Sequence, residues 1–143
     1  MSTLEQTIRE TIPMARYMDF EVTSLEALRM ETSAPLAPNI NIHGTAFAGA
    51  LYTLGALTAW GMLQSRLPDG AVLVMMEGNI RYRRPVTGAL LAACALDSTE
   101  TEVFLSKLDE ERKARMTVHV LIGDPTKPAA TFTGLMHASI PAK

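Results

Sequence analysis

The sequence predicts an α+β fold in which a curved antiparallel sheet wraps around one long central helix. Two observations support this prediction. No Asp, Glu, Lys or Arg lies between Thr32 and Ser65, and residues 45–63 within this stretch have the length and composition of one helix. A helix without a charged face has no side suited to water, so protein or lipid must surround it. Much of the remaining chain is patterned as strands, which can supply the surrounding wall.

Burial on several sides is indicated by the glycines of this segment. At about 100° per residue, Gly49, Gly55 and Gly61 point in three directions roughly 120° apart, so backbone can approach from each side. A transmembrane helix is disfavoured because the segment holds three Thr, three Gly and many Ala, and no basic cluster flanks it closely. We therefore interpret residues 45–63 as the central helix of a single domain that spans residues 1–143.

The other elements follow in order around this helix. Residues 3–11 form a short amphipathic helix, which Pro13 ends or follows with another turn. A second helix is expected at residues 98–112, with Ser98 or Thr99 as its cap. The strands are expected at residues 20–34 as a hairpin, and at residues 72–84, 89–96, 114–122 and 131–140.

Composition and charge exclude several classes of function. A formal net charge of −2 gives no general attraction to nucleic acid or to an anionic membrane. Cys94, the only cysteine, lies in an apolar run and is expected to be a buried strand residue. The polar amino terminus lacks a secretory signal, so we expect a reducing, cytoplasmic location. No pattern for a metal site, a phosphate-binding loop or a dinucleotide fold occurs, and no cofactor is expected.

Polar and apolar residues alternate just ahead of the central helix, in the run Asn39-Ile40-Asn41-Ile42-His43-Gly44-Thr45. If this run is extended, the side chains of Asn39, Asn41 and His43 project together, and Thr45 caps the helix. They would then lie beside the positive end of the helix dipole, whose free N–H groups can stabilise a carbonyl oxygen that gains negative charge. In the alternative interpretation, these side chains only satisfy backbone groups of the loop.

A second polar group lies on the strand at residues 72–84. Glu77, Asn79, Arg81 and Arg83 alternate and therefore share one strand face. In the functional interpretation, the basic end contacts a phosphorylated ligand, because the planar guanidinium group matches phosphate. Glu77 or Asn79 would then approach the reacting group. The alternative is an ordinary solvated strand face.

Other candidate side chains lie on the helix and in the later strands. Tyr52 and Thr53 are close enough to the start of the helix to line a pocket, whereas Trp60 is expected in the core. His119 and His137 fall within strand patterns and are interpreted as sheet residues. The polar run ahead of the helix therefore remains the main candidate site.

Two runs, at residues 41–54 and 78–86, resemble the putative thioesterase family of the hotdog superfamily. This family is also found as the carboxy-terminal domain of bacterial YiiD-type proteins, behind an acetyltransferase domain. The resemblance covers roughly residues 10–140 and implies the hotdog fold, a homodimer, and an acyl-thioester ligand such as acyl-CoA. It also implies an active site at the dimer interface near the helix start.

The sequence departs from better-studied hotdog thioesterases in one respect. Those enzymes carry a His-Gly-Gly turn and then an Asp or Glu about two turns into the helix. Aligned to this pattern, Phe47-Ala48-Gly49 occupies the turn and Ala56 stands where the acid is expected. Hydrolysis would therefore need another group, and His43 and Glu77 are the nearby candidates to activate water, with Asn41 and helix N–H groups polarising the thioester.

These observations predict a homodimer, with further pairing to a tetramer open, that hydrolyses an acyl-CoA or acyl-carrier-protein thioester. The acyl chain would lie along the central helix, and the pantetheine would run toward the arginines. A non-catalytic acyl-thioester-binding domain is the alternative. The predicted catalytic residues are Asn41, His43 and Glu77, and the predicted substrate-binding residues are Asn39, Thr45, Tyr52, Thr53, Asn79, Arg81, Arg83 and Arg84.

Overall fold

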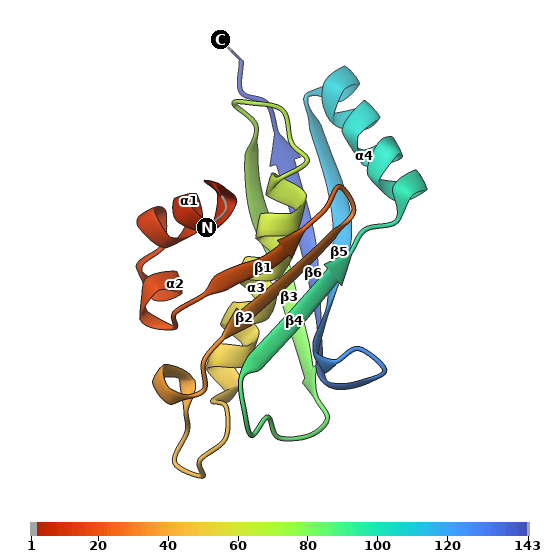
Figure 1. Cartoon of the computed structure of the whole chain (residues 1–143). Helices are drawn as coiled ribbons and strands as arrows, with labels where there is room; N and C mark the ends of the chain where they lie inside the picture. Colours follow the sequence, from red (N-terminus) through yellow and green to blue (C-terminus); the bar gives the residue numbers. More distant parts are fainter. Residues whose placement is uncertain (1–2, 143) are drawn as a thin grey trace.

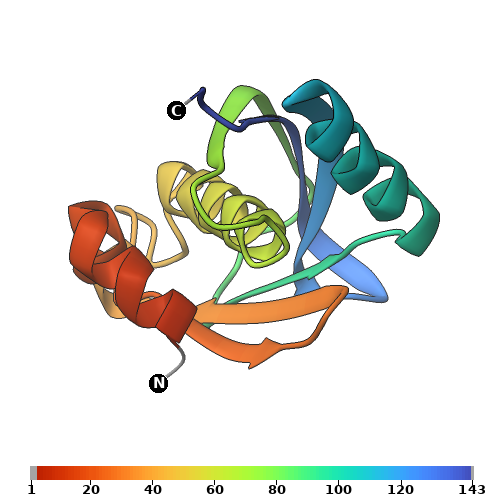
Figure 2. The same cartoon turned by 90° about the horizontal axis from the view of Figure 1, so that it is seen from above.

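The computed structural model describes residues 3–142 and confirms the predicted hotdog architecture. Figure 1 shows a six-stranded antiparallel sheet, in the order β1-β2-β4-β5-β6-β3, against the helix α3 (Ala48–Gln64). Viewed from above, α3 lies inside the curve of this sheet (Figure 2). The strands are β1 (Glu21–Leu25), β2 (Arg29–Ala34), β3 (Val72–Tyr82), β4 (Leu90–Ala95), β5 (Lys113–Asp124) and β6 (Lys127–Ser139).

The helices predicted at residues 3–11 and 98–112 lie close to these positions, Pro13 starts a further short helix, and the turn at Ala37–Asn39 was not predicted. These elements are α1 (Thr3–Thr11), α2 (Pro13–Tyr17), the 3₁₀ turn η1 (Ala37–Asn39) and α4 (Ser98–Glu111), which packs against β5. The predicted cap of α4 is wrong by one or two residues. Asp97 is the N-cap, because its carboxylate accepts a 2.8 Å hydrogen bond from the N–H of Glu100.

The start of α3 also differs from the prediction. The helix begins at Ala48 rather than at residue 45, and Phe47 is its N-cap, so the assignment of Thr45 as cap is wrong. Ala46 pairs with Ile40 in an isolated antiparallel bridge, and its N–H donates to the carbonyl of Val86. These contacts hold the backbone extended up to Phe47, so helical geometry starts only after it.

The concave face of the sheet packs closely on α3. A Cβ atom added at Gly55 would lie 2.7 Å from Cγ of Phe132 on β6, so any larger residue would push helix and sheet apart. The side chains that α3 buries are apolar or small. They are Leu51, Leu54, Leu57, Thr58, Ala59, Met62 and Leu63.

One side of α3 is incompletely covered within the chain. Ala50, Thr53, Ala56 and Trp60 are only half-buried. They recur at three- and four-residue intervals and therefore form a stripe. Among the described helices, none is long and apolar enough to cross a membrane.

A buried pair of hydroxyl groups joins α3 to the sheet. The side-chain oxygens of Thr58 and Thr32 on β2 lie 2.8 Å apart, and both residues are at most 1% exposed. The Thr58 hydroxyl donates to the carbonyl of Leu54 at 2.6 Å, so its oxygen accepts from Thr32. The pair thus fixes the position of the helix relative to β2.

Thr58→Val should lower the free energy of unfolding by about 1–3 kcal/mol, because the buried Thr32 hydroxyl loses its acceptor. The double variant Thr32→Val/Thr58→Val should recover part of this loss, because it leaves no unpaired hydroxyl. Urea unfolding measures both variants. Thr7→Val, at an exposed helix position, is the control, and additive losses at positions 32 and 58 would contradict the pairing.

Candidate active site

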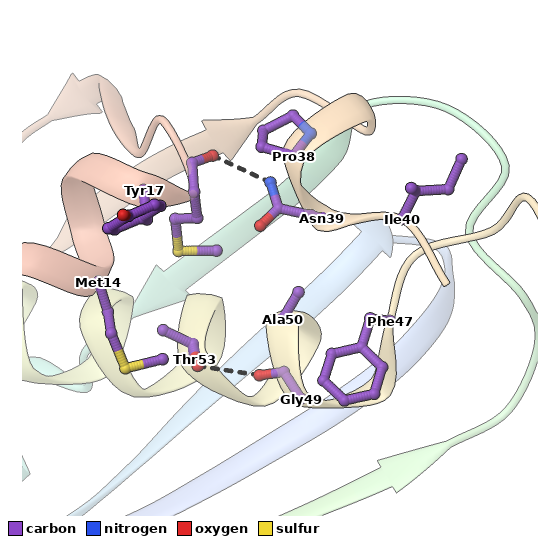
Figure 3. Close-up of a pocket in the computed structure, with 10 residues that line it drawn as sticks. Met14, Tyr17, Pro38, Asn39, Ile40, Phe47, Gly49, Ala50 and Thr53 are labelled. Atoms are coloured by element: carbon purple, nitrogen blue, oxygen red, sulfur yellow. Dashed lines mark hydrogen bonds between the residues drawn. The ribbon is translucent and has the colours of Figure 1, made fainter. Parts of the chain in front are cut away.

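An apolar groove of about 710 Å³ runs along the first half of α3. Figure 3 shows Met14 and Tyr17 of α2 at one end of the groove, and Ile40 and Phe47 at the other. Thr53 lies on the helix between them. The full lining consists of Met14, Tyr17, Met18, Pro38, Asn39, Ile40, Phe47, Gly49, Ala50 and Thr53. A lining of this kind suits the apolar part of a ligand.

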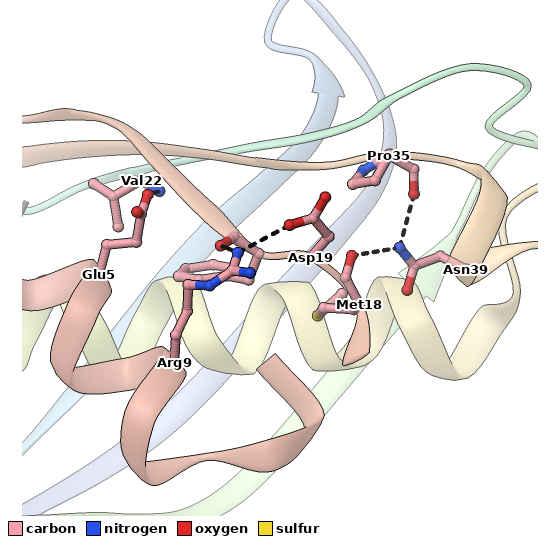
Figure 4. Close-up of polar contacts among 8 residues, drawn as sticks. Glu5, Arg9, Met18, Asp19, Val22, Pro35 and Asn39 are labelled. Carbon is pink, nitrogen blue, oxygen red and sulfur yellow. Dashed lines mark hydrogen bonds and ion pairs between the residues drawn. The ribbon is translucent and has the colours of Figure 1, made fainter. Parts of the chain in front are cut away.

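Asn39 is a structural part of this groove rather than an open polar group. It is 5% exposed, and its side-chain amide donates to the carbonyl of Met18 at 2.9 Å and to that of Pro35 at 2.7 Å. Figure 4 shows the amide between the end of α2 and the chain that follows β2. Asn39 thereby ties two walls of the groove together.

Asn41 organises the loop that precedes α3. Its side-chain oxygen accepts from the N–H groups of His43 and Thr45, at 2.8 and 3.1 Å, and its amide donates to the Thr45 hydroxyl at 2.9 Å. Gly44, with φ +83°, completes the turn. The predicted extended run is therefore wrong, because Asn41 satisfies the backbone of a tight loop. Only His43 of the three polar residues projects as an exposed side chain.

The first turn of α3 offers unpaired backbone donors. The N–H groups of Ala48 and Gly49 donate to no described residue, as is usual for the first turn of a helix. On the other side of this turn, the Tyr82 hydroxyl donates to the carbonyl of Ala48 at 2.7 Å. Burial, and secondarily the neighbouring Tyr52, raise the pKa of Tyr82. The hydroxyl therefore keeps its proton and its bond to the helix.

Glu77 and Asn79 lie on the sheet face that points away from α3. They pair with Leu135 and Thr133, whereas Ile80 pairs with the buried Phe132 on the helix side. Both line a separate hollow of about 470 Å³ on that outer face. Within one chain, Glu77 is therefore directed away from the first turn of α3. Its assignment as a water-activating group stays a prediction.

The basic end of β3 is exposed and lies next to the loop before α3. Arg81, Arg83 and Arg84 are all exposed, and neither ion pair found within residues 3–142 involves them. The backbone bond from Ala46 to Val86 brings this end of β3 close to the helix start. Arg81 shares the outer strand face of Glu77 and Asn79, so within one chain it also points away from α3, and contact between these guanidinium groups and a ligand at the helix start stays a prediction.

The sequence pointed to part of the groove and missed the rest. Thr53 lines it, as predicted, and donates a 2.9 Å hydrogen bond to the carbonyl of Gly49. Tyr52 instead packs edge-on against Phe132, with ring centroids 5.2 Å apart. The sequence analysis missed Met14, Tyr17 and Phe47. Met14 and Tyr17 follow Pro13, which can start a helix, and Phe47 lies near the predicted start of the central helix, so their apolar side chains could have been noticed.

Few groups capable of acid–base chemistry lie in or near the groove. Among residues 3–142, Tyr17 is the one titratable side chain that lines it, and His43 lies in the adjoining loop. Among the described residues, no cluster of His, Cys, Asp and Glu could hold a metal ion. Cys94 is buried in β4, and this burial raises the pKa of its thiol to about 12, so it is no nucleophile at neutral pH.

Comparison with known proteins relates this arrangement to thioesterases. The model of the family described as "Putative thioesterase (yiiD_Cterm)" matches residues 1–139. A putative thioesterase from Shewanella oneidensis is 38% identical, with a TM-score of 0.83 over 96% of this chain and 95% of that one. A Chlorobaculum tepidum protein of unknown function is 28% identical, with a TM-score of 0.89 over 96% and 93%.

A more distant structure shares the fold. A thioesterase from Haemophilus influenzae is 13% identical, with a TM-score of 0.75 over 99% of this chain and 94% of that one. At this identity the likeness concerns the curved sheet and its helix alone.

Asn39→Ala should lower the free energy of unfolding by about 1–3 kcal/mol, because two carbonyl groups at the groove lose their donor. Asn79→Ala, on the exposed outer face, should change it by no more than about 0.5 kcal/mol. Urea unfolding of both variants tests this difference. Equal stabilities would mean that the Asn39 amide is not a structural tie.

Proposed function

The chain belongs to the putative thioesterase family, and we propose that it hydrolyses an acyl-CoA or acyl-carrier-protein thioester at the start of α3. The observation that carries this proposal is the apolar groove, which reaches Gly49 in the first turn of α3, where the N–H groups of Ala48 and Gly49 donate to no described residue. An acyl chain would bury apolar surface along the groove, and its thioester oxygen would face the positive end of the helix.

In this reaction, water attacks the thioester carbon and the C–S bond breaks. The attacking water ends in the carboxylic acid, and the sulfur leaves as a thiol after taking up a proton. The N–H groups of Ala48 and Gly49 would stabilise the negative charge that develops on the carbonyl oxygen. His43, exposed beside this turn, is the proposed group that takes the proton from water.

A homodimer would complete the site. β3 ends the sheet, and its free edge carries the half-exposed apolar residues Val72, Val74 and Met76. A long apolar edge strand favours pairing with another chain. The half-buried stripe of α3 would gain cover in the same assembly. In a dimer, Glu77 of one chain could approach the start of α3 in the other chain. Further pairing of dimers would give a tetramer.

The carrier would lie beside the basic end of β3. We propose that Arg81, Arg83 and Arg84 contact the phosphates of coenzyme A, or the phosphopantetheine of a carrier protein, because guanidinium groups bind phosphate through paired donors. The other predicted ligand contacts, Tyr52 and Asn79, would depend on the dimer.

The proposed reaction uses groups of the chain and water, with no cofactor, and its expected setting is the cytoplasm.

One observation favours a second candidate function. The described residues that line the groove include no carboxylate and no histidine, and Ala56 stands on α3 where the resemblance to better-studied hotdog thioesterases would place an acid. A domain that binds acyl thioesters without hydrolysing them would need no such group. Its signature would be saturable binding of acyl-CoA with no release of thiol.

His43→Ala should lower kcat for acyl-CoA hydrolysis by about a hundredfold or more if His43 is the base. Free-thiol release from short, long and aromatic acyl-CoAs measures this. His119→Ala is the matched control, because His119 lies exposed on the outer sheet face, with Nδ1 3.1 Å from the Thr133 hydroxyl. Absence of turnover by the wild type on all three substrate types, with saturable binding retained, would support the binding domain instead.

Replacing Arg81, Arg83 and Arg84 together by Ala should raise the KM for acyl-CoA by about tenfold, since each exposed contact contributes a small amount. The KM for the same acyl group on pantetheine, which lacks the nucleotide phosphates, should stay unchanged. Arg115→Ala, exposed on the same outer face at the opposite end of the sheet, is the control. Equal increases for both substrates would refute the phosphate contact.

A further inference from the structure

We propose that the ring of Phe47 is a specificity-determining group that rejects acyl chains branched at the carbon next to the thioester carbonyl. This inference rests on the proposed function, because it assumes that the acyl chain occupies the groove. It concerns one side chain at the head of that groove. The position of the ring, its contact with Gly49 and its fixed backbone support the inference.

The ring lies where two cavities meet. Phe47 and Ile40 line the apolar groove, and they also line a neighbouring cavity of about 660 Å³ formed with Asn41, Ile42 and His43. Figure 3 shows the ring at the end of the groove, beside the first turn of α3. The acyl groove and the histidine that would act on the thioester are thus separated by this ring.

The ring of Phe47 packs where a side chain of residue 49 would lie, and this is possible because residue 49 is glycine. A Cβ atom at Gly49 would lie 2.5 Å from Cε2 of Phe47, closer than two non-bonded carbon atoms approach. The ring therefore lies directly on the backbone of the first helical turn. It occupies the space next to the N–H groups that would bind the thioester oxygen.

The backbone of Phe47 is fixed by three hydrogen bonds. Its N–H donates to the carbonyl of Asn39 at 2.7 Å, and its carbonyl accepts from Ala50 and Leu51 at 2.9 and 3.1 Å. The residue is 56% exposed, so a ligand in the groove can reach the ring. These bonds hold the ring at the head of the groove.

The location of the ring determines which part of a substrate it would contact. With the thioester oxygen at Ala48 and Gly49, the first carbon of the acyl chain would lie against the ring, and later carbons would pass along Ala50 and Thr53 toward Met14. A straight chain would lie flat along the ring. A methyl branch at the first carbon would need the space that the ring fills.

The test compares a straight acyl-CoA with an α-methyl-branched acyl-CoA of equal carbon number. Phe47→Ala should reduce the ratio of their kcat/KM values by at least about tenfold, since one methyl group in an apolar site has an effect of this size. Met14→Ala, at the far end of the groove, is the matched control: it should alter the preference for chain length and leave this ratio unchanged. An unchanged ratio in Phe47→Ala would overturn the inference.

Gly49→Ala is a second variant, which keeps the Phe47 ring but places a methyl group in the space that the ring occupies. It should shift the ratio in the same direction but by less, and Ala favours the helix, so the fold is expected to persist. A shift toward stronger rejection would count against the inference.

Dissociation constants for the same two acyl-CoAs, from displacement of a fluorescent acyl-CoA probe, separate this inference from the proposed function. If the wild type binds without turnover and Phe47→Ala shifts the ratio of dissociation constants, hydrolysis is refuted and the role of Phe47 stands. If the wild type binds neither compound, both proposals are refuted.

Discussion

The structure depends on enclosing a helix that carries no charged residue. Because α3 cannot present a charged face to water, the sheet must curve around it, and small residues let it approach. The contact of Gly55 with Phe132 sets the spacing of helix and sheet, and the buried pair Thr32–Thr58 sets their relative position. The curvature of the sheet follows from this requirement.

The groove owes its shape to polar side chains that do not themselves need to meet a ligand. Asn39 joins the end of α2 to the segment after β2, and Asn41 closes the loop that delivers the chain into α3. Together they position Phe47 at the helix start. The groove is thus an apolar trough that ends at the positive end of a helix dipole. In the proposed function, burial of an acyl chain would supply affinity and the backbone donors would orient the thioester.

Sequence patterns predicted the candidate site only in part. They identified Thr53 as a residue that lines a pocket, which the groove bears out, whereas the roles predicted for the helix start and for the basic end of β3 stay predictions. They did not reveal that Asn39 turns inward, since its partners, the carbonyls of Met18 and Pro35, depend on how separate segments meet. They also placed Glu77 near the site, whereas the pairing of β3 with β6 directs it to the opposite face of the sheet.

The sequence by itself determined the fold class, the order of helices and strands, and the identity of the central helix, because hydrophobic periodicity and missing charge are written into neighbouring residues. Tertiary structure alone decided where α3 begins, since the bridge between Ile40 and Ala46 holds the backbone extended to Phe47. It alone also created the groove, by bringing α2 beside the first turns of α3. The start of α3 and the groove both depend on contacts between segments that are distant in the sequence, and local residue patterns do not show which distant segments meet.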